Sequence, residues 1–107
     1  MKRILLIIGL LIVFFPVLQA QENKTLEMAH AAFRQHDYVD AVRYFKKVLR
    51  KTNDFESQKE LAFQLGLCYY KMKNYDAAKH WLEDAIGNHI DRMEAYLYLS
   101  EIGRAHV

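Results

Sequence analysis

The chain has 107 residues, of which 52% are hydrophobic and 26% are charged, and this size suits one small domain. Its 15 Lys and Arg residues nearly balance 13 Asp and Glu residues, which gives a formal net charge of +2 at pH 7. Nucleic-acid binding draws on clustered positive charge that neutralises phosphates, so we expect no nucleic-acid partner.

The first predicted element is a secretory signal peptide over residues 1–20. Lys2 and Arg3 form a short positive region, the apolar run ILLIIGLLIVFF follows, Pro16 interrupts it, and LQA precedes the polar QENKT. This order of features is typical of a signal that is cleaved after Ala20. The alternative is an uncleaved anchor, but a spanning helix needs about 20 apolar residues, and this run is shorter and contains a proline.

Cleavage would remove two of the 15 basic side chains and none of the 13 acidic ones, so the exported part would carry no net charge. We expect no stable membrane span in it. Cys68 is the only cysteine of the chain, so an internal disulfide is impossible even in an oxidising compartment.

The remaining sequence contains a repeat with a period of 37 residues. The stretch MAHAAFRQHDYVDAVRYFKKVL recurs in pattern as LGLCYYKMKNYDAAKHWLEDAI. The matched pairs are Met28 with Leu65, Ala29 with Gly66, Phe33 with Tyr70, Tyr38 with Tyr75, Ala41 with Ala78 and Phe45 with Leu82. A fixed period of this size indicates stacked supersecondary units that cannot bury their apolar faces alone.

Apolar residues fall at helical spacing within each unit and predict helices near 24–35, 38–51, 57–72, 75–87 and from about 91 onward. Asp37 and Asn74 stand between the two helices of a unit, where their side chains are suited to cap the second helix. Turns this short make the paired helices antiparallel neighbours.

The second unit resembles the tetratricopeptide repeat motif, which runs Trp-x-x-Leu-Gly-x-x-Tyr, then Ala-x-x-x-Phe, and often a later Pro. Its matching positions hold Ala62, Leu65, Gly66, Tyr69, Ala78, Leu82 and, in the proline place, Ile90. The first unit fits less fully, with Thr25, Met28, Ala29, Ala32, Ala41 and Phe45.

The resemblance covers residues 22 to 101 and implies an all-α fold of antiparallel helix-pair repeats, a tetratricopeptide-like α-solenoid. Two full repeats, about 22–55 and 59–92, would precede a truncated third at 93–101. The residues expected to pack the repeats are Ala29, Ala41, Phe45, Gly66, Tyr69, Ala78 and Leu82.

The third repeat begins in register, because Tyr96 and Leu99 follow Ala62 and Leu65 by 34 residues. It then ends halfway, with Gly103 where a large residue is wanted. Residues 102–107 read IGRAHV, which is the translation of a common sequencing adapter. We expect these residues to be adapter read-through and the natural protein to continue; the alternative is a genuine short C-terminus. An incomplete repeat also predicts a marginally stable fragment that self-associates.

No residue pattern predicts an enzyme, a metal site or a cofactor site. Cys68 lies between Leu67 and Tyr69, where the family packs a small buried residue, so we expect a structural thiol rather than a reactive one. The five histidines form no pair at metal-ligand spacing. The sequence also shows no nucleophile paired with a base, and no glycine-rich phosphate loop. We expect no catalytic activity in this segment.

The resemblance instead implies a partner-binding groove lined by the first helix of each repeat. The matching residues are Leu26, His30, Phe33 and Arg34 in the first unit and Phe63, Leu67, Tyr70 and Lys71 in the second, with Tyr96 or Leu97 extending them. The Lys and Asn of the family's carboxylate clamp are missing, so an amphipathic segment is a better candidate than an acidic C-terminal tail. The alternative is that Phe63, Leu67 and Tyr70 only complete the core with the third repeat.

The chain therefore predicts a noncatalytic module that binds a protein or peptide partner. The stretches FQLGLCYYKMKNYDAAKHW and EAYLYLSE also resemble the N-terminal repeats of Gram-negative envelope proteins with downstream β-propeller and OmpA-like, peptidoglycan-binding domains, some of which serve type IX secretion. That resemblance implies export to the periplasm or cell envelope and a docking role in a larger protein. A further alternative is that the chain is the recruitment module of an enzyme whose catalytic domain lies downstream.

Overall fold

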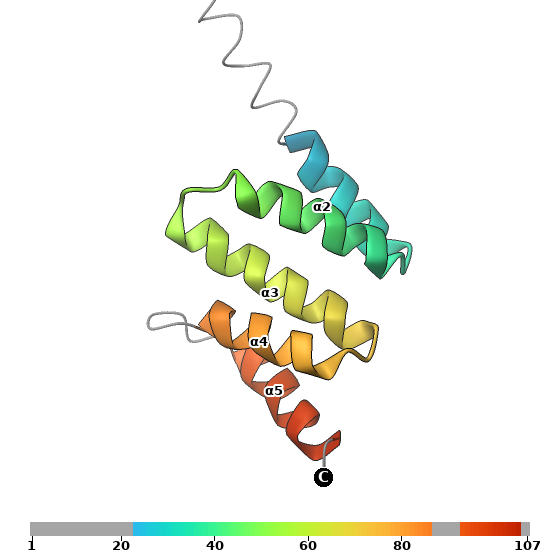
Figure 1. Ribbon diagram of the computed structural model, residues 1–107, viewed down its shortest axis with the longest axis vertical. Helices are drawn as coiled ribbons and strands as arrows, with labels where there is room; N and C mark the ends of the chain where they lie inside the picture. The colour runs from blue at the N-terminus through green and yellow to red at the C-terminus, as the bar shows by residue number, and fades with distance from the viewer. Residues whose placement is uncertain (1–22, 87–92, 106–107) are drawn as a thin grey trace, which may run out of the picture.

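The computed structural model describes residues 23–86 and 93–105, and these residues form helices joined by short connections (Figure 1). A first helix covers residues 23–34. It is followed by α2 (Tyr38–Arg50), α3 (Phe55–Lys71), α4 (Tyr75–Ile86) and α5 (Met93–Ala105). The predicted all-α class of helix-pair repeats is confirmed. The predicted signal peptide, the predicted start of the last helix near residue 91, and His106 and Val107 lie outside the described residues.

The second helix of each unit is capped by the residue expected from the sequence. The Asp37 carboxylate accepts a hydrogen bond from the backbone N–H of Asp40, and the Asn74 side-chain oxygen accepts one from the N–H of Ala77. These bonds satisfy N–H groups that have no partner within the first helical turn. Each cap therefore fixes where its helix begins.

The first helix of each unit ends in the same backbone motif. His36 and Lys73 have φ angles of 62° and 63°, in the left-handed region. The N–H of the next residue, Asp37 or Asn74, donates to a carbonyl five residues earlier, at 2.9 Å in both cases. This is the Schellman arrangement, which is usually built around a glycine. The 37-residue period thus extends to the backbone angles of the turns.

Helix α3 begins at Phe55, earlier than the predicted residue 57, because Asp54 caps it. The Asp54 carboxylate accepts hydrogen bonds from the N–H of Ser57 at 2.8 Å and from the Ser57 hydroxyl at 2.6 Å. These two bonds lower the pKa of the Asp54 carboxyl below its ordinary value. The side-chain amide of Gln58 also donates to the Thr52 carbonyl, which ties the connection to the helix.

The helices stack in chain order. Helix α3 packs against α2 on one side and α4 on the other, and α5 packs against α4 (Figure 1). The polypeptide therefore forms a layered array in which each of these helices packs mainly against the helices next to it in the sequence. This is the arrangement of a repeat protein rather than of a closed bundle.

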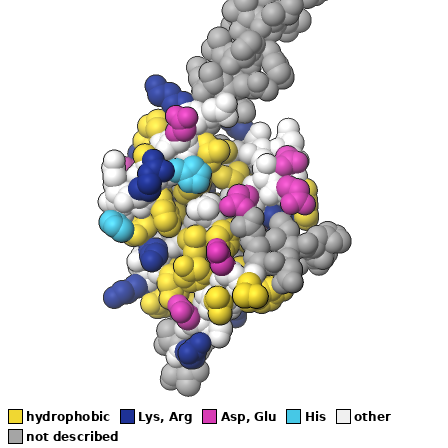
Figure 2. Space-filling view, turned by 180° about the vertical axis from the view of Figure 1, so that it is seen from behind, with side chains coloured by type: hydrophobic (Ala, Val, Ile, Leu, Met, Phe, Trp, Pro, Cys, Tyr) yellow, Lys and Arg dark blue, Asp and Glu magenta, His cyan; other side chains and the backbone are white. Residues whose placement is uncertain are grey.

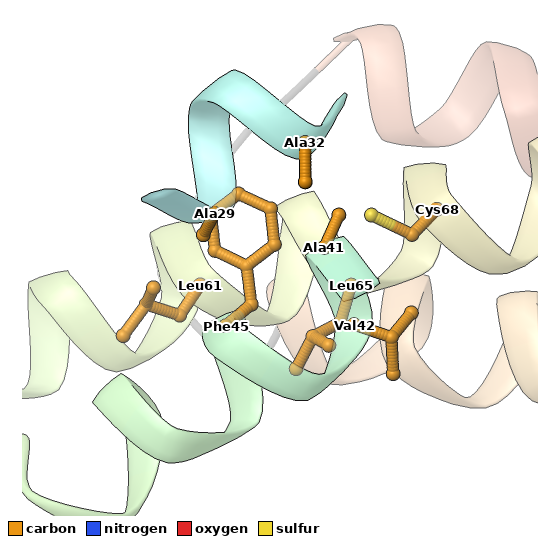
Figure 3. Close-up of a cluster of buried hydrophobic side chains, with 8 residues drawn as sticks. All are labelled: Ala29, Ala32, Ala41, Val42, Phe45, Leu61, Leu65 and Cys68. Atoms are coloured by element: carbon orange, nitrogen blue, oxygen red, sulfur yellow. The ribbon is translucent and has the colours of Figure 1, made fainter. Parts of the chain in front are cut away.

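Two clusters of buried side chains hold the array together. The first joins the helix over residues 23–34 to α2 and α3 through Ala29, Ala32, Ala41, Val42, Phe45, Leu61, Leu65 and Cys68 (Figure 3). The second joins α3, α4 and α5 through Ala62, Phe63, Ala78, Leu82, Ala85, Ala95 and Ile102. Tyr69 and Trp81 are partly buried and pack against both clusters, so they connect one core to the other.

Small residues bring α3 and α4 into close contact. Gly66 and Ala78 are buried, and a Cβ atom added to Gly66 would lie 2.7 Å from the Leu82 side chain. Most of the expected packing residues, Ala29, Ala41, Phe45, Ala78 and Leu82, have no exposed surface, and Tyr69 is partly buried. No helix in the described ranges is both long and apolar enough to cross a bilayer.

Candidate protein-binding face

The first unit places its four predicted binding residues on the helix over residues 23–34, with graded exposure. Leu26 and Phe33 are partly buried and pack against the first core cluster. The His30 ring meets the ring of Phe45 edge to face at 5.2 Å between centroids, and Arg34 is exposed. Of these four residues, only Arg34 is therefore fully exposed to a partner. Leu26, His30 and Phe33 expose part of their surface.

Phe33 is held in place by the residue that starts the next helix. Its ring meets the ring of Tyr38 edge to face, with centroids 5.4 Å apart. The Tyr38 hydroxyl in turn lies 2.7 Å from the His36 ring nitrogen Nδ1. These contacts fix Phe33 at the turn, and the next residue in the chain, Arg34, is exposed.

The second unit places its predicted residues on α3, where one is buried in the core and two pack against it. Phe63 is buried in the second cluster, and Leu67 and Tyr70 are partly buried against it. Lys71 is exposed. Phe63, Leu67 and Tyr70 therefore make many of their contacts within the core shared with the next repeat, as the alternative interpretation expects.

Tyr70 of α3 contacts two residues of α5, Tyr98 and Glu101. Its ring packs edge to face against Tyr75 at 5.8 Å and Tyr98 at 4.8 Å between centroids. Its hydroxyl donates a hydrogen bond to the Glu101 carboxylate. That bond, with burial as a smaller cause, raises the pKa of Tyr70 to about 12. Tyr70 therefore stays a neutral donor across the physiological pH range.

Sequence reasoning did not single out Tyr98 and Glu101, although a signal for one of them was present. Adding the 34-residue offset of the third repeat to Leu67 gives Glu101. The residues suggested as an extension, Tyr96 and Leu97, are 50% and 59% exposed, and the contacts with Tyr70 are made by Tyr98 and Glu101 instead.

The predicted binding residues all lie on the first helix of a unit. We call the exposed surface of these residues the binding face: Leu26, His30, Phe33, Arg34, Phe63, Leu67, Tyr70 and Lys71. Phe33 with Arg34, and Tyr70 with Lys71, are the same pair of positions 37 residues apart. The view from behind shows hydrophobic side chains in the middle, several Lys and Arg side chains toward the left, and Asp and Glu side chains among them and toward the right (Figure 2). In the binding face, the cations Arg34 and Lys71 are exposed and the aromatic residues Phe33 and Tyr70 are partly buried, a combination that suits a partner with apolar and acidic side chains.

The described residues provide neither a cluster suited to a metal ion nor a reactive thiol. Their His, Cys, Asp and Glu side chains form no group of three that could hold a metal ion. Cys68 has no exposed surface, and burial raises the pKa of its thiol to about 12. A thiol in that setting is a packing residue, because the nucleophile is the thiolate.

A hollow of about 400 Å³ lies between α4 and α5. Its lining is Asp76, Lys79 and Glu83 from α4 and Leu99, Ile102 and Gly103 from α5. Gly103 has nothing within 4 Å of where a Cβ atom would stand, whereas the position 34 residues earlier holds the partly buried Tyr69. The large residue that fills this place in the second unit is therefore missing from α5.

A family model matches most of the chain. Residues 25–102 match the family model described as the fourth ARM domain of tetratricopeptide repeat protein 21. No curated protein sequence matches the chain. The matched range includes both helix pairs and most of α5, so it covers the binding face described above.

Proposed function

The chain belongs to the family of the fourth ARM domain of tetratricopeptide repeat protein 21, a helical repeat family, and from this membership we propose that it is a noncatalytic scaffold that binds a protein or peptide partner. The first helix of each repeat provides the binding face. The partner is an amphipathic segment whose apolar side chains contact the aromatic residues and whose acidic side chains contact the basic ones.

The observation that carries this proposal is the repeated aromatic and basic pair. Phe33 with Arg34 and Tyr70 with Lys71 occupy equivalent positions in two successive repeats, and both cations are exposed. Aromatic and Arg side chains contribute most of the energy at typical interfaces, and two equivalent pairs would contact a single partner at two places. The core contacts of Phe33 and Tyr70 hold these side chains rigid, which lowers the entropy cost of binding.

The experiment compares charge reversals on and off the binding face. The chain from residue 21 onward is immobilised as wild type, as Arg34→Glu with Lys71→Glu, and as Lys47→Glu with Arg50→Glu on the exposed side of α2. Proteins captured from an envelope extract of the source organism are quantified by mass spectrometry. Partners retained by wild type and the α2 control but lost from the first variant support the proposal. Equal capture by all three proteins would contradict it.

We further propose that the module is exported to the periplasm or cell envelope of a Gram-negative bacterium. The support is the N-terminal sequence, in which two cations, an apolar run and a small residue precede the polar start of the first repeat. A fusion of residues 1–25 to alkaline phosphatase, which is active only after export, tests this. Activity that disappears when ILLIIGLL is interrupted by two Asp residues is expected. Activity independent of that change would refute export by this segment.

In this setting, the module would dock partners as the N-terminal part of a larger envelope protein. The sequence resemblance of the second and third repeats to such proteins supports this part of the proposal. A recruitment role beside a downstream catalytic domain would use the same face. The sequence of the source locus distinguishes the two.

A further inference from the structure

The same aromatic pair stands beside the turn inside each repeat. Phe33 meets Tyr38 edge to face, with ring centroids 5.4 Å apart and an angle of 75° between the ring planes. Tyr70 meets Tyr75 in the same way, at 5.8 Å and 63°. The two pairs occupy equivalent positions 37 residues apart. Each pair joins the last turn of one helix to the first residue of the next, so it supports the turn between them.

Each of these turns carries two basic side chains at equivalent positions. Arg34 and His36 belong to the first turn, and Lys71 and Lys73 belong to the second. All four residues are exposed, and we call them the turn edge. Within the described ranges, Arg34, Lys71 and Lys73 form no ion pair. Their charges are therefore available to a partner.

The two turns lie side by side. Successive helices run in opposite directions, so both turns stand at one edge of the array, on the right of Figure 1. Phe33 and Tyr38 beside the first turn and Met72 within the second all pack against the first core cluster. Axes of helices in contact are about 8–10 Å apart, so equivalent residues of the two turns are separated by about that distance. The turn edge thus presents two basic pairs in a row.

Two residues of the turn edge have a strained backbone. The φ angles of His36 and Lys73 are 62° and 63°, a conformation that glycine adopts without strain and other residues adopt at a cost in stability. Neither side chain is buried in the core, so packing does not account for its presence. Strained residues cluster at sites that bind a ligand. A basic side chain at the same strained position in both repeats therefore indicates a role in binding.

The acidic side chains near the turns are engaged within the fold. The Asp37 carboxylate accepts a hydrogen bond from the N–H of Asp40, and the Asp40 carboxylate pairs with Arg43 at 3.0 Å. Asp76 lies in the first turn of α4, where the positive end of the helix dipole favours a negative charge. Glu101 of α5 accepts the hydrogen bond from α3 described above. These contacts compensate part of the negative charge at this edge.

We propose that the turn edge binds an extended segment of a partner protein that carries an acidic residue at every third position. A polyproline II segment has three residues per turn and rises about 3.1 Å per residue, so every third side chain faces the same way at intervals of about 9 Å. That interval matches the spacing of the two turns. This inference rests on the proposed function, because it names the conformation and the charge pattern of the partner at the same face.

The graded exposure of the binding face favours an extended partner over a helical one. An amphipathic helix binds in a broad apolar groove, but Phe63 is buried and Leu67 and Tyr70 are partly buried. The exposed residues of the face, Arg34 and Lys71, are charged and stand at the turns. A narrow segment that runs along the turn edge reaches both cations and the outer surface of the aromatic rings beside them.

The test uses a synthetic peptide that repeats Pro-Glu-Leu three times. Proline favours the polyproline II conformation, and Glu recurs at every third position. One control peptide has the same composition with its Glu residues adjacent, and another has Gln in place of Glu. Nuclear magnetic resonance shifts of the isotope-labelled chain from residue 21 onward measure binding at millimolar peptide and low salt. We expect the largest shifts at residues 34–37 and 71–74, and binding at least about threefold tighter than that of either control.

Two substitutions at Lys73 separate its charge from its backbone strain. Lys73→Gln removes the charge and keeps a side chain at the left-handed position, whereas Lys73→Gly removes both. We expect each to weaken binding of the acidic peptide by at least about twofold, while only Lys73→Gly raises the melting temperature. A protein that is more stable but binds less tightly is not expected of a turn with a structural role alone. Lys51→Gln, at the C-terminal end of α2 on the opposite edge, is the matched control and should bind as wild type does.

Four results would overturn the inference. These are no shifts at the turn edge with millimolar peptide, equal affinity for the three peptides, unchanged binding to Lys73→Gln, and tighter binding of a helical peptide with Glu at every seventh residue.

The proposed function is tested separately by capture. Loss of captured proteins in the Arg34→Glu with Lys71→Glu variant, with peptide binding unchanged in Lys73→Gln, would support the proposed function and reject the extended acidic partner. Equal capture by all the immobilised proteins, with peptide binding that depends on Lys73, would do the reverse.

Discussion

Gly66 and Leu82 approach so closely that a Cβ atom on Gly66 would lie 2.7 Å from both Cγ and Cδ2 of the leucine and 3.3 Å from its backbone nitrogen. The backbone contact cannot be relieved by a side-chain rotation. The contact therefore sets the distance between α3 and α4 at the centre of the second core cluster.

Gly66→Ala should destabilise the protein by about 1–3 kcal/mol, because overpacking at this contact exceeds the helix-propensity gain of roughly 1 kcal/mol. Urea denaturation followed by circular dichroism measures the change. Gly103→Ala is the matched control: it meets nothing within 4 Å and should be neutral or slightly stabilising. A Gly66→Ala protein as stable as the Gly103→Ala protein would show that the helices separate at little cost.

Lys73→Gly should stabilise the protein by up to about 1 kcal/mol, because a glycine adopts the left-handed conformation without strain. Lys73 has a φ of 63° and is exposed, so its side chain gives up little packing. Thermal melting measures the effect. Lys71→Gly, two residues earlier in the last turn of α3, should instead destabilise. If both glycines have the same effect, the turn does not strain Lys73.

Cys68 should be almost unreactive toward a thiol reagent in the folded protein. With a pKa of about 12, only about one thiol in ten thousand is ionised at pH 8, and the sulfur has no exposed surface. Absorbance of the released thiolate follows the reaction, with the urea-unfolded chain as the reactive reference. Reaction at the same rate in both states would place Cys68 on the surface.

The Asp54 cap should make stability depend on pH in the acidic range. The folded-state pKa of Asp54 is below its ordinary value of 3.8, so its contribution is fully present above that value and is lost as pH falls through the lower, folded-state pKa. Melting temperatures between pH 2 and pH 6 measure this. Asp54→Asn keeps a capping side chain without the titration, so its melting temperature should fall less on acidification. Parallel curves for the two proteins would exclude a role for this carboxylate.

The source locus should encode a different sequence after Glu101. Residues 102–107 read IGRAHV, the translation of a sequencing adapter, and we propose that the natural frame continues with another helix. Sequencing genomic DNA across the Glu101 codon tests this. A frame that encodes IGRAHV and then stops would establish a genuine C-terminus, with Ile102 as its native core residue.

The repeat architecture could be predicted from sequence because it depends on spacing that survives substitution. The 37-residue period, the capping residues Asp37 and Asn74 and the small residues at the helix contact are all visible as patterns. The Schellman turns were not predicted, because His36 and Lys73 occupy positions where glycine is the usual signal. The first turn of α3 was missed because its cap, Asp54, stands within an irregular polar stretch.

The candidate site was harder to predict because a residue on the first helix of a repeat can serve the core or a partner. Phe63 is buried in a cluster that also contains residues of α5, and Tyr70 contacts Tyr98 and Glu101 of that helix. These contacts depend on the stacking of the next repeat and not on local sequence. Arg34 and Lys71, whose long charged side chains favour solvent, were the residues whose exposure could be anticipated.

Trp81 is the only tryptophan of the chain and packs against both core clusters. Its indole is therefore a built-in optical reporter at the junction of two cores. If the repeats melt as one cooperative unit, tryptophan emission and far-ultraviolet circular dichroism will change together; if one repeat frays first, emission will change while much of the helical signal remains. The position of this single ring makes the degree of coupling between neighbouring repeats measurable without any label.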